Sequence, residues 1–415
     1  MSEHRPEVAD VLRTYGPAFL KRSGHALSAR QKQVLKDITL CRTAALGGHV
    51  DACDQCGHRR ISYNSCRNRH CPKCQAMASA EWMTQRAADL LPVPYFHVVF
   101  TLPEAIASLA LQNKQVLYDI LFRAASQTLL QIAADPKHLG AQIGFFLVLH
   151  TWAQNLHHHP HVHGVIPGGG IAPDGSCWIS CTKGRKHFFL PVKVLSRVFR
   201  GKFLDLLRRA FKRGELSFYG KLEGLGDPQA FERWLRTSYK TDWVVYVKPP
   251  FGGPVHVLKY LARYTHRVAI SNRRLIDIEN GRVRFRWKDY ADGRIQKIMT
   301  LDAKEFIRRF LLHVLPKGFV RIRHYGFLAN RHRKEKLARC RELIRFTEDR
   351  QPASGAEAAA PSDILADLQA GDPKRPGSCP MCGTGEMVLI EILKPIPGCR
   401  IARQGCVPIL GLDTS

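Results

Sequence analysis

Apolar residues recur every three or four positions in several parts of this chain, and this spacing predicts helices. The pattern covers most of 1–48, returns in 78–91, and runs through 104–135 in a stretch long enough for two helices. Short apolar runs bounded by proline, glycine or charged residues predict strands at 94–103, 143–152, 160–168, 242–251 and 282–290. Helices and strands mixed in this way indicate an α+β protein.

Between these elements the polar pattern is less regular. The cysteine-rich stretch 49–75 has no clear periodicity and is expected to be mainly loop. Glycine and proline in 168–180 supply turn residues, so 161–180 is expected to form a hairpin. The stretch 255–269, "VHVLKYLARYTHRVA", is expected to be a helix between two strands.

The composition divides the chain into four segments. We expect a helical segment with a zinc-binding ribbon at 1–88 and a main domain at 89–348. A stretch rich in Ala, Pro and Ser follows and is expected to be a flexible linker, 349–372. The remaining tail, 373–415, carries four cysteines.

The charge indicates the class of partner. The 415 residues include 63 Lys and Arg against 35 Asp and Glu, a formal net charge of +28. Such an excess favours a polyanion, either nucleic acid or an anionic membrane surface. No apolar run reaches the roughly 18–20 residues that span a bilayer, and the N-terminal stretch has no apolar signal core. We therefore expect a cytoplasmic nucleic-acid-binding protein without a membrane partner.

Thirteen cysteines in a reducing compartment favour metal sites over disulfides. The pattern C-x2-C-x14-C-x2-C is typical of a structural zinc ion held by two knuckles, and its members are Cys53, Cys56, Cys71 and Cys74. Cys66, His70 and His49 lie within reach as substitute ligands. In the tail, Cys379 and Cys382 form a third knuckle and are candidates for a second zinc site, with Cys399 and Cys406 downstream.

A histidine-rich strand is the first candidate catalytic feature. In "HPHVHGVI" alternate residues point to one face, so His161 and His163 project together with Val162 behind them. Two neutral imidazoles side by side can bind one divalent ion, which can polarise a phosphate. A histidine-triad nucleotide hydrolase, which also carries His-x-His-x-His, is the competing interpretation.

Two tyrosines decide between these interpretations. Tyr260 and Tyr264 are four residues apart, so on a helix their hydroxyls lie on one face. Their phenols have an ordinary pKa near 10 and need a cationic or metal field to attack phosphate efficiently. Lys259, Arg263 and Arg267 supply positive charge around the pair and are candidate DNA contacts. A histidine-triad hydrolase has no role for this pair.

The chain resembles the rolling-circle transposases of the insertion-sequence-ninety-one type, which are HUH endonucleases with two catalytic tyrosines. Four stretches carry the resemblance in one order: "YNSCRNRHCPKCQ", "FHVVFTLP", "HPHVHGVIPGGG" and "YLARYTHRVAIS". The resemblance implies a central antiparallel sheet flanked by helices and preceded by the zinc ribbon. It implies cleavage and rejoining of single-stranded DNA at element ends and target.

Carried over residue by residue, the resemblance makes His161 and His163 ligands of Mg²⁺ or Mn²⁺. It makes Tyr260 and Tyr264 nucleophiles that form 5′-phosphotyrosine links and free a 3′-hydroxyl. HUH enzymes usually add a third polar ligand, for which the candidates are His97, Asn155, His256 and His266. Two alternatives remain: a replication initiator or relaxase with the same chemistry, and a non-catalytic zinc-dependent DNA-binding protein.

Overall fold

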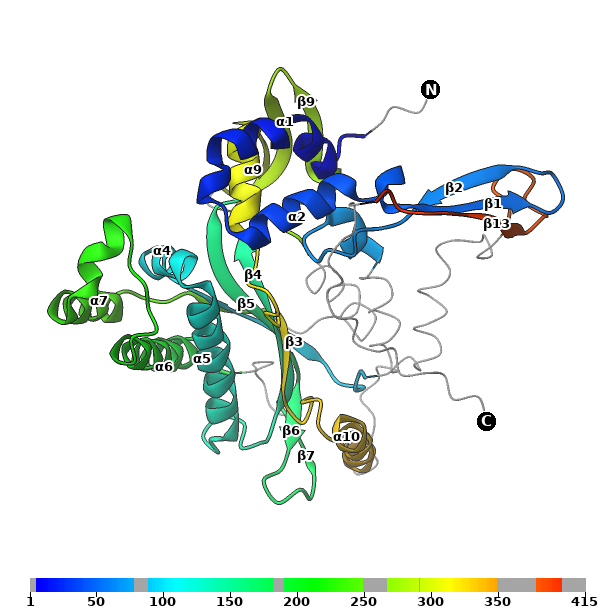
Figure 1. Cartoon of the computed structure of the whole chain (residues 1–415). Helices are drawn as coiled ribbons and strands as arrows, with labels where there is room; N and C mark the ends of the chain where they lie inside the picture. The colour runs from blue at the N-terminus through cyan, green and yellow to red at the C-terminus, as the bar shows by residue number, and fades with distance from the viewer. Residues whose placement is uncertain are drawn as a thin grey trace.

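A five-stranded antiparallel sheet forms the centre of the molecule in this computed structural model (Figure 1). The structure describes residues 5–77, 89–181, 190–248, 267–290, 292–348 and 378–397. The strand order is β12-β4-β5-β3-β8. In chain order the strands are β3 (Tyr95–Thr101), β4 (Gly144–Trp152), β5 (His158–Pro167), β8 (Val245–Lys248) and β12 (Ile322–Gly326).

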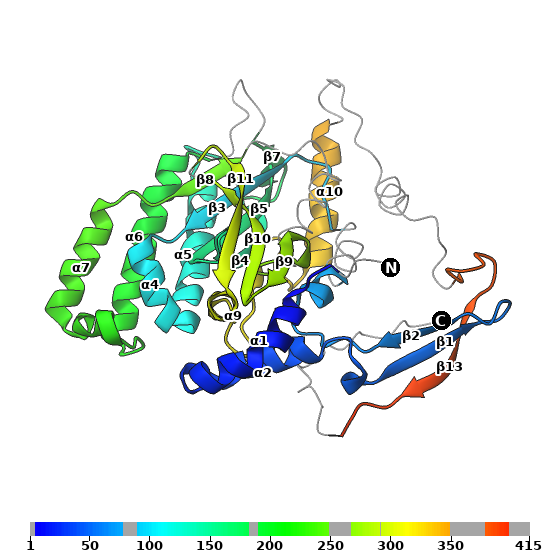
Figure 2. The same ribbon diagram turned by 90° about the horizontal axis from the view of Figure 1, so that it is seen from above.

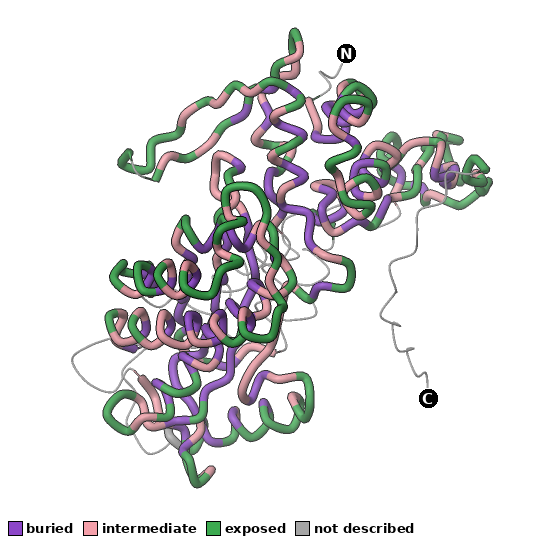
Figure 3. The backbone as a smooth tube through the Cα atoms, turned by 60° about the vertical axis from the view of Figure 1, so that its left-hand side comes forward, coloured by how far each residue is buried: buried purple, intermediate pink, exposed green. Residues whose placement is uncertain are grey.

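Helices cover one face of this sheet, on the left in Figure 1. They are α4 (Glu104–Gln112), α5 (Lys114–Ala134), α6 (Val192–Lys212) and α7 (Pro228–Lys240). Phe96, Val98 and Phe100 of β3 pack into the same buried core as Phe199 and Phe203 of α6. Buried and exposed residues alternate along these helices, as Figure 3 shows. The helical periodicity expected for 104–135 is confirmed.

A second core lies at one end of the sheet. It joins α1 (Val8–Ser23), α2 (Ala29–Leu40) and α9 (Ala303–Leu312) to a three-stranded antiparallel sheet. That sheet consists of β9 (Leu275–Glu279), β10 (Arg282–Asp289) and β11 (Ile295–Asp302). The N-terminal helices are thus packed against the C-terminal half of the chain.

Two smaller units complete the described chain. The hairpin β6 (Gly169–Ile171) and β7 (Trp178–Ser180) packs with α10 (Arg333–Glu348). A ribbon of three strands projects from the body, as Figures 1 and 2 both show. It consists of β1 (Gly48–Cys53), β2 (Arg59–Tyr63) and, from the tail, β13 (Met387–Leu393).

Two sequence expectations were wrong in detail. The stretch 49–75 contains β1 and β2, whose short length and flanking cysteines concealed the strand pattern. The hairpin expected over 161–180 is confined to β6 and β7, because β5 pairs with β3 and β4 in the central sheet. The α+β architecture is confirmed. Among the described residues no helix is both long and apolar enough to cross a bilayer.

Candidate functional site

The face of the central sheet opposite the helices carries four histidines. His161 of β5 pairs directly with His150 of β4 and with Thr101 of β3. His163 pairs with Val148 and Val99, so it lies on the same face, two residues along the strand. His97 of β3 lies diagonally from His163. The predicted common face for His161 and His163 is confirmed, with Val162 fully buried on the other side.

Three of these imidazoles converge. His150, His161 and His163 each offer a ring nitrogen, and the three nitrogens lie within 4.8 Å of one another. The ring centroids of His150 and His163 are 4.4 Å apart, and those of His161 and His163 are 4.8 Å apart. The indole of Trp152 stacks on His150 at 4.7 Å and restricts its ring. This spacing suits one small ion bound by three nitrogen ligands.

His161 and His163 each form a hydrogen bond through Nδ1, and these bonds orient the two rings. His161 Nδ1 donates to the backbone carbonyl oxygen of His159 at 2.7 Å, because a carbonyl can only accept. His163 Nδ1 lies 2.8 Å from His97 Nε2, and the two rings stack. A hydrogen bond at the outer nitrogen is the usual means by which proteins fix the tautomer and orientation of a metal-binding histidine.

The electrostatic environment keeps these rings neutral. Burial lowers the pKa of His161 to about 3, with a further contribution from His159. Burial also lowers the pKa of His97 to about 3 and that of His163 well below its usual value. Since metal ligands must be deprotonated, neutral imidazoles at physiological pH are the state that binds an ion.

The third histidine, His150, was not among the sequence candidates. Of those candidates, His97 contacts His163, whereas Asn155 lies in the turn between β4 and β5 and hydrogen-bonds His157. His256 and His266 lie outside the described residues. The available signal was a histidine at the end of the apolar run "FFLVLH", in the predicted strand that directly precedes the His-x-His strand.

Tyr260, Tyr264, Lys259 and Arg263 also lie outside the described residues. The chain on either side of that segment, however, is placed at the histidine face. Lys248, the last residue of β8, pairs with His97 and helps lower its pKa. Arg267 contributes to the lowered pKa of both His161 and His163, so its charge lies near them. Lys248 and Arg267, the two described residues that flank 249–266 in sequence, therefore both lie near the histidines.

The cysteines form two groups of four, and these divide the sulfurs differently from the expected site of Cys53, Cys56, Cys71 and Cys74. Cys71 and Cys74 converge with Cys41 and Cys66, all buried. The Sγ–Sγ distances are 3.6 Å for Cys66–Cys74 and 3.7 Å for Cys41–Cys74 and Cys41–Cys71. A zinc tetrahedron with bonds of about 2.3 Å requires about 3.8 Å between sulfurs. The donor set and spacing therefore fit zinc.

The other pair, Cys53 and Cys56, converges with Cys379 and Cys382 of the tail. The Sγ–Sγ distances are 3.7 Å for Cys53–Cys382 and 3.6 Å for Cys56–Cys379. This grouping could not be predicted from the sequence, because all three knuckles have the same Cys-x-x-Cys spacing. The fold decides which pairs meet. Cys41 was missed because it stands alone at the end of α2.

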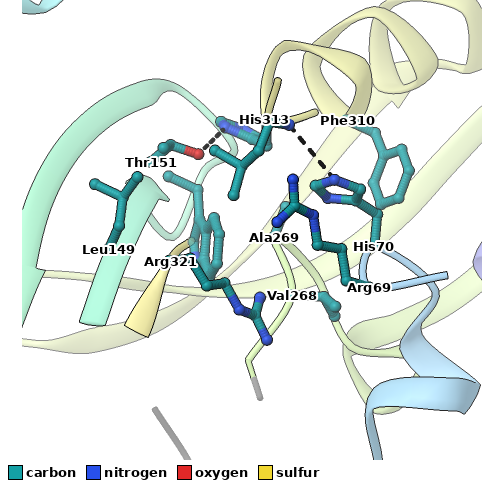
Figure 4. Close-up of a pocket in the computed structure, with 11 residues that line it drawn as sticks. Arg69, His70, Leu149, Thr151, Val268, Ala269, Phe310, His313 and Arg321 are labelled. Carbon is teal, nitrogen blue, oxygen red and sulfur yellow. Dashed lines mark hydrogen bonds between the residues drawn. The ribbon is translucent and has the colours of Figure 1, made fainter. Parts of the chain in front are cut away.

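The loop that carries Cys66, Cys71 and Cys74 is anchored to the main domain by two half-buried arginines, Arg69 and Arg321 (Figure 4). Arg69 donates to the backbone carbonyls of Phe319 and Pro316, the latter at 2.7 Å. Arg321 donates to Gln75 Oε1 at 2.8 Å and to the carbonyl of Arg267 at 3.2 Å. The intervening cavity, about 10 Å³, is near the minimum for one water molecule. Arg321 thus links the cysteine loop to the residue that follows the tyrosine segment.

Comparison with known proteins gives consistent matches. The family model described as a putative transposase matches residues 144–336, and the model described as a transposase zinc-binding domain matches residues 11–102. The putative transposase y4qJ of Sinorhizobium fredii (strain NBRC 101917 / NGR234) is 57% identical over 399 residues, which cover 96% of this chain and 98% of that protein. The transposase for insertion sequence element IS801 of Pseudomonas savastanoi pv. phaseolicola is 29% identical over 309 residues, covering 74% of this chain and 72% of that protein. No solved structure matches.

Proposed function

The chain belongs to the IS91-type transposases, and from this premise we propose that it cleaves and rejoins single-stranded DNA through tyrosine nucleophiles during rolling-circle transposition. DNA is therefore its partner. The nucleophiles are Tyr260 and Tyr264. The observation that carries the proposal is the three-histidine face, near which lie Lys248 and Arg267, the described residues that flank the tyrosine-bearing segment in sequence.

The histidine group fits a divalent ion held by His150, His161 and His163. His161 uses Nδ1 to bind its own backbone, which assigns Nε2 as its metal-facing nitrogen. His163 meets His97 through Nδ1, which likewise assigns Nε2. His97 is then a positioning residue that orients His163. An all-imidazole donor set favours Mn²⁺ over Mg²⁺, because Mg²⁺ prefers oxygen ligands.

When bound, the ion supplies Lewis-acid polarisation of the scissile phosphate and a fixed orientation for it. The protein supplies the remaining parts of the chemistry. Arg267 adds positive charge next to the histidines, which favours a DNA phosphate there and the ionised form of a nearby phenol. In a neutral imidazole one ring nitrogen carries no proton and is available to bind the ion.

The covalent step conserves the energy of the phosphodiester. A tyrosine oxygen attacks the phosphorus, the Oη–P bond forms, and the bond from phosphorus to the 3′-oxygen breaks. The 3′-oxygen leaves as a hydroxyl with a proton, and the 5′-phosphate remains on tyrosine. Rejoining runs in reverse, when a 3′-hydroxyl attacks the phosphotyrosine and releases the phenol, so no ATP is required. Two tyrosines allow a first cleaved strand to be held while a second is cut.

The cysteine groups have a structural role in the proposal. The family contains a zinc-binding domain, and zinc is consistent with both cysteine groups. We assign Cys41, Cys66, Cys71 and Cys74 to the ion of that domain. Because Arg69 and Gln75 of the same loop are bonded to the main domain, this ion fixes the loop against the residues that follow the tyrosine segment.

The test is covalent capture of DNA. Wild-type protein incubated with Mn²⁺ and single-stranded DNA from the ends of the element that encodes it should give an adduct that survives SDS. The Tyr260→Phe/Tyr264→Phe double variant should give none, whereas Tyr219→Phe, at a tyrosine 66% exposed, should behave as wild type.

An adduct formed by the double variant would refute the nucleophile assignment. If wild-type protein binds these ends and forms no adduct on any of them, the non-catalytic DNA-binding alternative is favoured. A replication initiator or relaxase would form the same adduct on a replication or transfer origin rather than on element ends.

A further inference from the structure

The ribbon combines β1 and β2 from the N-terminal part of the chain with β13 from the C-terminal tail. Its four cysteines lie where β1 and the tail meet. We propose that Cys53, Cys56, Cys379 and Cys382 bind a second zinc ion that links the C-terminal tail to the strands β1 and β2. The matched zinc-binding domain, 11–102, includes Cys53 and Cys56 but ends far before the tail pair. The inference does not depend on the chemistry proposed above.

The two halves of this site have the same local geometry. In each, the glycine that follows the second cysteine has a positive φ, +70° at Gly57 and +73° at Gly383, which turns the chain back after the knuckle. The amide of Gly57 donates to the carbonyl of Cys53 at 3.1 Å, and that of Gly383 donates to the carbonyl of Cys379 at 3.0 Å. Both turns present their two sulfurs on one side.

Backbone amides also point at the sulfurs in both halves. Cys53 Sγ accepts from the amides of Gln55 at 3.4 Å and Cys56 at 3.5 Å. In the tail, Cys379 Sγ accepts from Met381 N at 3.4 Å, and Cys382 Sγ accepts from Gly385 N at 3.3 Å. Such amides stabilise the negative charge of thiolates, the form in which cysteine binds zinc. The cysteines are free, and their sulfurs are too far apart for disulfides.

Hydrogen bonds between the halves hold the two knuckles in register. Asp54 donates its amide to the carbonyl of Glu386 at 3.1 Å, and its Oδ1 accepts from the amide of Glu386 at 2.9 Å. Beyond this point β13 pairs with β1 from Met387, opposite Cys53, to Leu393, opposite Gly48. The cysteine group thus lies at one end of the β1–β13 pair, whose two strands come from segments more than 300 residues apart in sequence.

The strand β13 buries little apolar surface in this pair. Nearly every side chain of β13 is exposed, including apolar ones such as Ile392 at 72% exposed and Leu389 at 54%. Short strands without a buried apolar face are marginally stable in water. A metal ion whose ligands come equally from β1's end and from the tail supplies the missing stabilisation, since binding free energy at such a site is folding free energy.

Two measurements test the proposal: the zinc content of the protein and the protection of the β13 amides from hydrogen exchange. Full-length protein reconstituted with Zn²⁺ under reducing conditions and desalted should hold one zinc ion in each four-sulfur group, besides any ion bound at the three-histidine site. The Cys379→Ser/Cys382→Ser variant should contain about one zinc ion fewer than wild type. Hydrogen exchange should show amides of 387–393 protected in wild type and unprotected in this variant, with α1 and α2 unchanged. Cys177→Ser, at an exposed cysteine outside both groups, should match wild type in every measurement.

The Cys53→Ser/Cys56→Ser variant tests whether zinc binding and β13 protection need both halves of the site and not the tail cysteines alone. It should lose the same single zinc ion and the same protection of 387–393. The proposal is overturned if either double variant keeps as many zinc ions as wild type, or if the zinc content falls while 387–393 stays protected. It is equally overturned if wild type holds one ion that the Cys41→Ser/Cys66→Ser variant loses. DNA capture by tyrosine is measured separately, so failure of either proposal is recognisable.

Discussion

Individual histidines have distinct roles at the sheet face, and substitution separates them. His150 is 2% exposed and belongs to the convergent group, whereas His97 reaches that group only through His163. We expect His150→Ala to weaken Mn²⁺ binding by more than about 100-fold and His97→Ala by about 10- to 100-fold, the range for residues that orient a ligand. Titration of Mn²⁺ followed by electron paramagnetic resonance measures both.

The matched control is His138→Ala, since His138 is exposed and lies outside the histidine group. It should bind Mn²⁺ as wild type does. Thermal unfolding of each variant separates lost affinity from lost structure. If a folded His150→Ala variant binds Mn²⁺ with wild-type affinity, His150 is not the third ligand of the ion.

At the scale of elements, the turn between β4 and β5 connects the two strands whose register places His150 opposite His161. Three successive carbonyls of this turn each accept a hydrogen bond from another element. Gln154 accepts from Arg274, Asn155 from Arg309 at 3.2 Å, and Leu156 from His313 Nε2 at 3.1 Å. Leu156 is buried with φ of +64°, a conformation that costs energy for a side chain of this kind. The surrounding side chains stabilise this strained turn.

Two adjacent arginines of α9 test this stabilisation. Both contact Glu305, but Arg309 is 16% exposed and reaches the turn, whereas Arg308 is 54% exposed and, among the described residues, bonds only Glu305. We expect Arg309→Ala to lower the free energy of unfolding by about 1–3 kcal/mol, because a carbonyl and a carboxylate lose a charged donor. Arg308→Ala should cost about 0.5 kcal/mol or less.

Urea denaturation of the two variants gives the comparison, and equal destabilisation would show that the turn contact contributes nothing. The residues that hold the turn come from α9 and from just before β9, which follow it by more than a hundred residues. The histidine face therefore depends on the second core as well as on its own sheet.

For the whole molecule, the net charge of +28 governs affinity for DNA. Lys and Arg that neutralise phosphates release counterions, so binding weakens as salt rises. If about six to ten phosphates of single-stranded DNA are contacted, a plot of log affinity against log salt concentration should have a slope of about −4 to −7. Fluorescence anisotropy with a labelled single strand between about 50 and 200 mM salt measures it.

A slope near zero would contradict a polyanion-binding role for the charge excess. The slope should be similar for element-end and unrelated strands, because phosphate contacts carry no sequence information. Any difference in affinity between the two strands at fixed salt then reports base recognition, which the net charge does not provide.

Local patterns in the sequence were sufficient for much of this molecule. The periodicity of apolar residues located α1, α2, α4, α5 and the strands β3, β4 and β5, because each element buries one face. Strand alternation placed His161 and His163 together, since side chains two apart share a face. The motifs in their order indicated the family. The roles of Tyr260 and Tyr264 remain predictions from those motifs.

Long-range pairing was not encoded in any local pattern. A Cys-x-x-Cys knuckle supplies two sulfurs, and nothing in its spacing specifies which other pair completes the tetrahedron. The fold brought Cys71 and Cys74 to Cys41 and Cys66, and it brought Cys53 and Cys56 to the tail. Strand register likewise placed His150 opposite His161. Local periodicity reports which face of an element is buried, whereas contact between distant segments depends on the packing of the whole chain.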